Sequence, residues 1–223
     1  MIDKKMVLTL DTETASLVTD VFDVGYTIAD KSGNVVCERS ALVREVFSNQ
    51  RKMRKAFYYD KVFTEYLPML ERGEIVIRPW MDIVAMLRAD IQEHGVNVLS
   101  AFNLGFDKRV MTNTHKEHGD GRPVLPRKVD LLDIWLFSCQ VKINTQGYKT
   151  WARATGAVSP AGNYRSNAES VYRYVMGLDS FEEKHTALAD ARIETEILAS
   201  CFRRKRKIPY NVLIGNPWKL IQD

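Results

Sequence analysis

The chain has 223 residues, of which 45% are hydrophobic and 27% charged, and its formal net charge is +4. That composition is typical of one globular domain and excludes collagen-like and low-complexity chains. No apolar run approaches the roughly 20 residues of a membrane helix, and acidic residues near the N-terminus argue against a signal peptide.

Three cysteines, Cys37, Cys139 and Cys201, are odd in number and far apart in the sequence. Because none of them forms a CxxC pair, the spacing predicts neither a disulfide framework nor a zinc site. A reducing cytoplasm is therefore the compartment that we expect.

The basic residues gather in two runs, RKMRK at 51–55 and RRKRK at 203–207. A run of this kind is typical either of a solvated helix face or of a surface that contacts phosphates, and the sequence leaves both interpretations open.

The first half of the chain begins with strands. Residues 6–10 are a short apolar run that predicts a buried strand. Residues 21–29 alternate between apolar and polar or small side chains, which predicts a strand with one buried face. A turn at 31–34 and a returning strand at 35–43 complete a hairpin.

Helical periodicity dominates the rest of the chain. It extends from about 48 to 93, and a short strand is predicted at 96–101. Further helices are expected at 130–141, at 147–156, at 166–177 and from Thr186 onward. Residues 208–223 contain two prolines and show no period, so they predict a tail or a docking arm.

This order of elements predicts an α/β fold, in which a mixed sheet is flanked by helices on both sides. The sequence shows no internal repeat and no flexible linker, so we expect a single domain over residues 1–207. Sites in such sheets form at the carboxyl ends of strands, and acidic residues follow two of the predicted strands.

The first acidic group is Asp11-Thr12-Glu13, after the strand at 6–10. Side chains at i and i+2 share one face of an extended chain, and two neighbouring carboxylates suit Mg²⁺ or Mn²⁺. The second is Asp107, after the strand at 96–101. Asp107 is also well placed for a helix N-cap, and Asn103 is positioned to hold the loop with its side-chain amide.

A histidine and an aspartate five residues apart occur twice. His185 and Asp190 lie at the start of the last predicted helix, whereas His115 and Asp120 lie in a polar stretch next to glycines. We therefore expect the site at His185–Asp190 and interpret His115–Asp120 as a surface loop.

Gathering four carboxylates from three separate elements is unfavourable without cations, because like charges repel. Two divalent metal ions would neutralise them, and such pairs are a common device for phosphodiester hydrolysis. A histidine beside them can accept a proton near pH 7.

The order and spacing of these residues resemble the DEDDh exonucleases, the DnaQ-like 3′–5′ exonuclease family. The matching motifs are DTET at 11–14, N-x-x-F-D ending at Asp107, and H-x-A-x-x-D-A beginning at His185. The resemblance implies a ribonuclease H-like fold with three antiparallel strands followed by parallel ones. It also implies two Mg²⁺ or Mn²⁺ ions and release of nucleoside 5′-monophosphates from a 3′ end.

The resemblance also implies roles for individual residues. Asp11 would bridge both metals, Glu13 and Asp190 would hold the first, and Asp107 would act near the second. His185 would be the general base. The residues implied to contact the substrate are Leu17 and Phe106, which match the family's apolar wedge, together with Thr12, Thr14 and Asn103.

Two departures from the family pattern concern how the terminal nucleotide is bound. Ala15-Ser16 follows DTET, and segment 44–80 lacks a Gly-Ile-type turn. Both argue against a replicative proofreading subunit. The compact chain is instead similar to stand-alone exonucleases encoded by bacteriophages, which would act in the host cytoplasm.

We expect a nucleic-acid partner, with single-stranded DNA favoured, and no membrane association. One alternative is an exoribonuclease of the same family acting on RNA 3′ ends. A catalytically inactive nucleic-acid-binding module and a ribonuclease H-like endonuclease fit the complete motif set less well. The sequence does not report the oligomeric state.

Overall fold

The computed structural model describes residues 5–126 and 128–222. Residues 1–4, 127 and 223, which include the ends of the predicted domain and tail, lie outside the described residues. A six-stranded sheet with the order β4-β3-β2-β1-β5-β6 forms the centre of the fold. Its strands are β1 (Met6–Thr14), β2 (Val21–Asp30), β3 (Val35–Val43), β4 (Val76–Arg78), β5 (Val96–Ala101) and β6 (Asp130–Asp133).

The sheet is mixed, as the sequence predicts. Strands β1, β2 and β3 pair antiparallel, whereas β5 runs parallel to β1 and β6 runs parallel to β5. The short strand β4 adds a further parallel pair at the edge next to β3.

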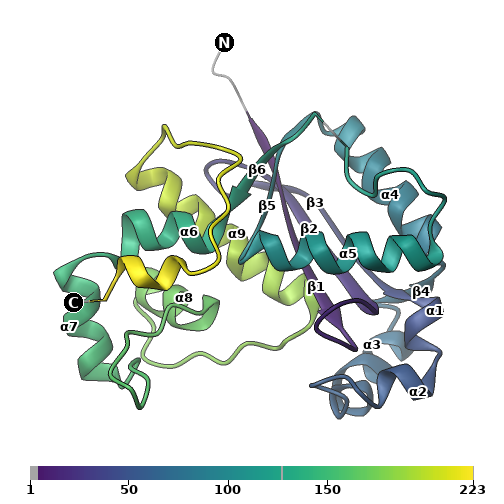
Figure 1. The fold of residues 1–223 in the computed structure, drawn as a ribbon, viewed down its shortest axis with the longest axis horizontal. Helices are drawn as coiled ribbons and strands as arrows, with labels where there is room; N and C mark the ends of the chain where they lie inside the picture. The colour runs from purple at the N-terminus through teal and green to yellow at the C-terminus, as the bar shows by residue number, and fades with distance from the viewer. Residues whose placement is uncertain (1–4, 127, 223) are drawn as a thin grey trace.

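Helices cover both faces of this sheet (Figure 1). Helices α4 (Trp80–Glu93) and α5 (Leu104–His118) lie on one face, and α6 (Ile134–Ser138) and α9 (Ala187–Arg204) lie on the other. The remaining elements are α1 (Arg44–Phe47), α2 (Gln50–Met53), the π-helix η1 (Val62–Tyr66), α3 (Leu67–Glu71), the π-helix η2 (Cys139–Ile143), α7 (Gln146–Thr155), α8 (Ala168–Met176) and the 3₁₀ helix η3 (Pro217–Leu220).

Strand β1 shows why two layers of helices are needed. Leu8 and Leu10 pack in the cluster beneath α4 and α5, whereas Val7 packs in the cluster beneath α6 and α9. A strand that buries both faces is apolar throughout, which is typical of a central strand. Within residues 6–10 the polar exception, Thr9, forms a 3.0 Å hydrogen bond with the Ser100 hydroxyl on β5.

Three expectations from the sequence are wrong in detail. Strand β1 does not end at residue 10, because its pairing with β2 continues through Asp11 and Glu13. Strand β2 is buried on both faces rather than one, since α9 covers the second face and Thr195 bonds Thr27 at 2.6 Å. The segment from 48 to 93 is helical in parts, and α4 confirms the last of them, but turns and the strand β4 interrupt the predicted helical pattern.

The predicted helix at 130–141 is also wrong at its start. Residues Asp130–Asp133 form β6, and the helix begins after Asp133, whose carboxylate accepts a 2.9 Å hydrogen bond from the Leu136 amide. A short apolar run is compatible with either period, so only the neighbouring strand β5 decides the conformation.

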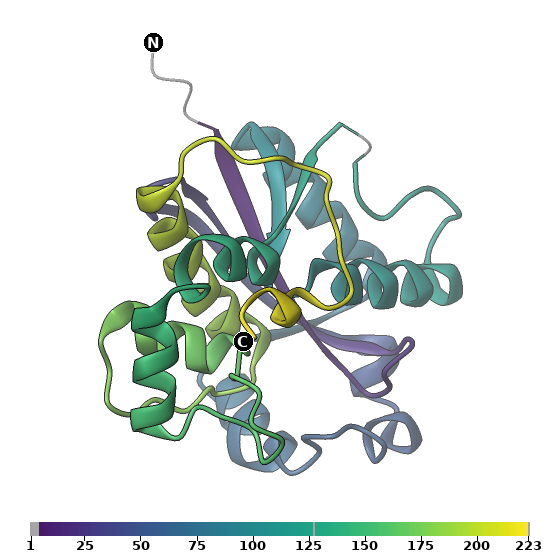
Figure 2. The same ribbon diagram turned by 60° about the vertical axis from the view of Figure 1, so that its left-hand side comes forward.

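The C-terminal segment from 208 to 222 packs against this edge of the molecule, where it runs past α6 (Figure 2). The backbone N–H of Asn211 donates to the Leu131 carbonyl at 2.7 Å, and the side-chain Oδ1 of Asn211 accepts from the Leu131 backbone N–H at 2.9 Å. Ile221 is fully buried.

Within the described part of the chain, no helix has both the length and the apolar composition needed to span a bilayer. All three cysteines are buried and free.

Candidate active site

The three motifs meet at one edge of the sheet. Asp11 and Glu13 project from the last residues of β1, Asp107 lies in the first turn of α5, and Asp190 lies in the first turn of α9. A cavity of about 420 Å³ lies between these elements. Its lining includes Asp11, Thr12, Glu13, Asn103, His185 and Asp190 from the motifs.

Gly25 allows the start of α9 to approach the sheet at this point. It lies on β2 directly opposite Asp11 in the strand pairing. A Cβ atom at this position would lie 2.1 Å from the backbone nitrogen of Leu188, closer than atoms can pack. The absence of a side chain therefore lets the first turn of α9 bring Asp190 next to β1.

Backbone amides and a hydroxyl hold Asp107 in place. Thr12 donates its hydroxyl to Asp107 Oδ1 at 2.8 Å. Asp133 accepts hydrogen bonds from the backbone amides of Asn103 and Leu104, which fixes the loop before Asp107. The loop is thus held by the Asp133 carboxylate, whereas Asn103 has a left-handed backbone and makes no side-chain cap bond.

The carboxylates around the cavity resist ionisation. Burial raises the pKa of Asp11 well above its usual range, and the carboxylates of Glu194 and Asp107 raise it further. Burial and neighbouring carboxylates likewise raise the pKa of Glu13 to about 9 and that of Asp190 to about 8. Burial is also the main reason why the pKa of Asp107 is raised to about 7. The protein therefore holds these charges together at a cost in free energy.

The donor set fits hard divalent cations. Asp11 Oδ2 and Asp190 Oδ1 are shielded from solvent and have no hydrogen-bond partner. Oxygen atoms of Glu13 and Asp190 and a ring nitrogen of His185 all lie within 4.8 Å of one another, close enough to share one ion. Carboxylate oxygens are the ligands that Mg²⁺ and Mn²⁺ prefer.

His185 lies just before α9, beside its partner aspartate. Its Nδ1 is 3.8 Å from Asp190 Oδ2 and 3.8 Å from Glu183 Oε2, so both contacts are longer than a hydrogen bond. Burial, and then the nearby Lys61 ammonium, lower the pKa of His185 below its usual value. A histidine with a lowered pKa is neutral near pH 7 and is able to accept a proton.

A second cavity of about 390 Å³ borders the first, and Thr12, Glu13 and Tyr58 line both. Three predicted substrate-contacting residues, Thr14, Leu17 and Phe106, line this second cavity. Leu17 is 77% exposed, so its side chain is accessible at the cavity wall. Asn103 lines only the first cavity.

Sequence reasoning missed several residues of this site. Glu194 is buried on α9, lines the first cavity and accepts the Phe102 amide at 3.0 Å. Its position four residues after Asp190 places it on the same helix face, a signal that was readable from the sequence. Glu183 and Tyr58 also line the cavity, but neither stands at a distinctive spacing from the motifs.

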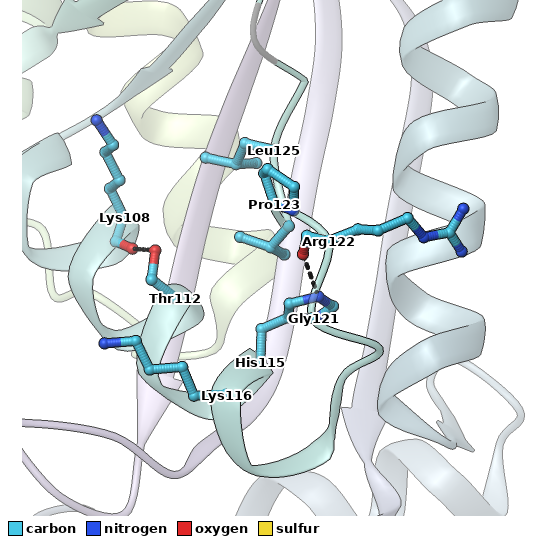
Figure 3. A pocket seen from close by; sticks show the side chains of 9 residues that line it. Lys108, Thr112, His115, Lys116, Gly121, Arg122, Pro123 and Leu125 are labelled. Carbon is cyan, nitrogen blue, oxygen red and sulfur yellow. Dashed lines mark hydrogen bonds between the residues drawn. The ribbon is translucent and has the colours of Figure 1, made fainter.

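The surface loop that the sequence predicts for the second histidine–aspartate pair is confirmed for Asp120, which is exposed after the end of α5, but it is wrong for His115. His115 lies on α5 and is only 5% exposed. Its Nδ1 accepts the Trp80 indole N–H at 2.9 Å, so its Nε2 carries the proton and donates to the Arg122 carbonyl at 2.7 Å. Figure 3 shows this ring beneath residues 121–125, where a separate cavity of about 510 Å³ contains none of the motif carboxylates.

The two basic runs differ in their surroundings. In the first, Lys52 pairs with Asp20 at 2.6 Å and with Glu117 at 3.1 Å, whereas Lys55 lines the second cavity. The second run begins at the C-terminal end of α9. Arg203 is thirteen positions after Asp190 on this helix, a distance of about 20 Å. Basic side chains at that end are favoured by the helix dipole alone.

Solved structures of exonuclease I share this fold. One is the zinc-bound complex of Escherichia coli exonuclease I with single-stranded DNA, with a TM-score of 0.60 and 12% sequence identity over 91% of this chain. Another is a product-bound structure of exonuclease I, with a TM-score of 0.60 and 13% identity over 92% of this chain. The matched regions cover 42% and 45% of those longer chains, so this chain spans less than half of them.

The likeness confirms the predicted fold class, a ribonuclease H-like mixed sheet flanked by helices. No protein-family model matches the sequence, and no curated protein matches it. Nothing in these comparisons supports a bacteriophage origin.

Proposed function

We propose that this protein is a metal-dependent 3′–5′ exonuclease that removes nucleoside 5′-monophosphates from single-stranded DNA. The observation that carries the proposal is the meeting of Asp11, Glu13, Asp190 and His185 around one cavity, with Asp107 buried close enough to Asp11 to raise its pKa. Carboxylates that raise one another's pKa in a buried site are typical of a catalytic centre rather than of a structural one.

Asp11, Glu13, Asp107 and Asp190 would hold two Mg²⁺ or Mn²⁺ ions. When bound, a pair of such ions stabilises charge on the attacking and leaving oxygens of a phosphodiester. Thr12 orients Asp107 through its 2.8 Å hydrogen bond. The four carboxylates, which repel one another in the metal-free protein, supply the negative charge that makes the site selective for divalent cations.

His185 is the general base in this proposal. It is neutral near pH 7 because burial and Lys61 lower its pKa. Its ring nitrogen can therefore take a proton from a water molecule attacking the phosphorus, and the neighbouring Asp190 and Glu183 carboxylates would stabilise the resulting imidazolium.

The second cavity would restrict cleavage to the end of a nucleic-acid strand. Its 390 Å³ falls in the range of small-molecule sites, and an apolar wall that includes Leu17, Phe57 and Phe106 suits the flat face of a base. One terminal nucleoside would occupy it, while the adjacent phosphate lies at the carboxylates. The resemblance of the motifs implies that this terminus is the 3′ end.

DNA is favoured as the substrate because structural neighbours of this chain are complexes of exonuclease I with single-stranded DNA oligonucleotides. The alternative of an exoribonuclease uses the same carboxylates and differs in whether the cavity accepts a 2′-hydroxyl.

The test uses matched 5′-labelled DNA and RNA oligonucleotides, single- and double-stranded, with Mg²⁺, with Mn²⁺ or with EDTA. We expect a ladder of products shortened from the 3′ end of single-stranded DNA, which EDTA abolishes. Faster digestion of RNA would reassign the substrate. Internal cleavage products, or no cleavage with either metal, would contradict the proposal.

A further inference from the structure

The segment between the first two motifs reaches the catalytic cavity at Tyr58. The Tyr58 ring lies flat on the His185 imidazole, with 4.4 Å between ring centroids and 12° between their planes. Tyr58 is followed by Lys61 and by η1 (Val62–Tyr66), and residues 58–66 are referred to below as the clip.

His185 needs support from outside its own segment. Residues 178–186 form no helix or strand, and the backbone of His185 is left-handed, with φ of 51°. That conformation is unfavourable for a residue with a side chain and persists only where the surroundings impose it. A flexible loop alone would leave the imidazole free to rotate away from the cavity.

A second contact joins the clip to the same loop. The Lys61 ammonium donates a hydrogen bond to the carbonyl oxygen of Lys184, the residue before His185. The same ammonium lies 5.3 Å from the centre of the Tyr58 ring. The backbone on one side of His185 and the face of its ring are therefore both held by the clip.

A third contact anchors the far end of the clip to the start of α9. Asp23, fully buried on β2, accepts the Tyr66 hydroxyl at 3.0 Å and the Ala187 amide at 2.9 Å on the same carboxylate oxygen, Oδ2. The clip thus contacts residue 184 directly, and Asp23 links it to residue 187 on the other side of His185.

We propose that the clip is a positioning element of the exonuclease, and that Tyr58 fixes the orientation of the His185 imidazole by stacking on it. This inference rests on the proposed function, in which His185 is the general base. It assigns a role to the segment between residues 44 and 80, for which the three motifs supply none. Tyr58 acts through His185, so it is a positioning residue rather than a catalytic one.

The first test does not depend on activity. The imidazole proton resonances of His185, identified by their loss in His185→Ala, are recorded by NMR in the metal-free protein. We expect an upfield ring-current shift in the wild type that persists in Tyr58→Phe and disappears in Tyr58→Leu. Unchanged resonances in Tyr58→Leu would overturn the stacking.

The second test is a double-mutant cycle on single-stranded DNA. Tyr58→Leu should lower kcat about 10- to 100-fold, because a misplaced catalytic group loses rate steeply. Tyr58→Phe keeps the stacked ring and should retain most of the activity. In the His185→Ala background, Tyr58→Leu should have no further effect. Equal losses in both backgrounds would show that Tyr58 acts independently of His185.

Two further variants separate positioning from folding. Tyr174→Leu removes a tyrosine that packs on Trp151 outside both cavities and away from the 178–186 loop, and it should leave kcat unchanged. Lys61→Met removes the other contact of the clip, so it should broaden or move the His185 resonances even if Tyr58→Leu fails to fold. If the wild type degrades no nucleic acid, the proposed function fails while the NMR experiment still decides whether the clip holds His185.

Discussion

Two histidine–aspartate pairs with the same spacing in the sequence have different surroundings in this fold. His115 lies inside the helix α5 with both ring nitrogens in hydrogen bonds, to Trp80 and to the Arg122 carbonyl. His185 lies just before the first residue of α9, and its Nδ1 is 3.8 Å from each of two carboxylates without a hydrogen bond to either. A histidine whose nitrogens are both committed cannot exchange protons with a substrate, whereas one with an open nitrogen can.

The surroundings of the aspartates differ in the same way. Asp120 is bound by the backbone and side chain of Arg122, which lowers its pKa to about 2. Asp190 faces other carboxylates in a buried cavity, and its pKa is raised to about 8. The comparison teaches that the spacing of two residues identifies a site only when their partners are known. Variants at each pair, and at the carboxylates around one of them, test this difference.

The largest effect is expected at Asp11, whose pKa is raised by burial and by four neighbouring carboxylates. Asp11→Asn should lower kcat on single-stranded DNA by about 10³-fold or more, because it removes a charged ligand that contributes several kcal/mol to the transition state. Steady-state kinetics with saturating Mg²⁺ measures the loss. The exposed Asp82 on α4, outside both cavities, offers the matched control Asp82→Asn. Full activity of Asp11→Asn would contradict the site.

His185→Ala should lower kcat by about 10²- to 10⁴-fold, the usual contribution of a positioned acid–base group. Its melting temperature should change little, because the half-exposed ring makes no hydrogen bond to the neighbouring carboxylates. Activity assays measure the change in kcat, and thermal melts measure the change in melting temperature. The comparison of the two pairs would be wrong if this variant kept its activity.

His115→Ala should show the opposite pattern, a loss of stability with nearly unchanged kcat for the folded protein. It leaves the buried Trp80 indole N–H without an acceptor, which costs about 1–3 kcal/mol. In a chain of this size each kcal/mol lowers the melting temperature by about 2–4 °C. If His115→Ala abolished activity while remaining folded, the third motif would have to be moved to Asp120.

The metal-free protein should lose stability as the pH rises. Glu13, Asp107 and Asp190 have folded-state pKa values of about 9, 7 and 8, above those of an unfolded chain near 4. Between pH 4 and 9 the folded state therefore binds more protons than the unfolded state, and stability falls. Melts in EDTA across this range should show the fall, and Asp11→Asn should reduce it and raise the melting temperature. A stability that rose toward pH 9 would contradict the repulsion.

The smallest effect concerns the proton on His185. Lys61 lowers the pKa of His185, second to burial. The rate should rise with pH through that lowered pKa, and Lys61→Met should shift the acid limb of the kcat profile upward by a fraction of a unit. Arg203→Gln, about 20 Å away at the other end of α9, should leave the limb in place.

The sequence determined the motifs, the antiparallel opening of the sheet and the residues Asp11, Glu13, Asp107, His185 and Asp190. These features depend on patterns between residues that are near one another in the sequence, such as alternation along a strand or a fixed spacing within a helix turn. Such patterns can be recognised from the sequence alone. Where a segment fits two periods, as at 130–133, the sequence predicted a helix and the neighbouring strand β5 imposed a strand.

Only the tertiary structure decided what surrounds those residues. The close approach of α9 at Gly25, the buried Glu194, the stacking of Tyr58 on His185 and the burial of His115 all join residues far apart in the sequence. No spacing rule predicts such contacts, because they depend on how helices pack across a sheet rather than on any local period. The charge of the cavity follows from the same packing, since desolvation and repulsion act only after the chain has brought the carboxylates together.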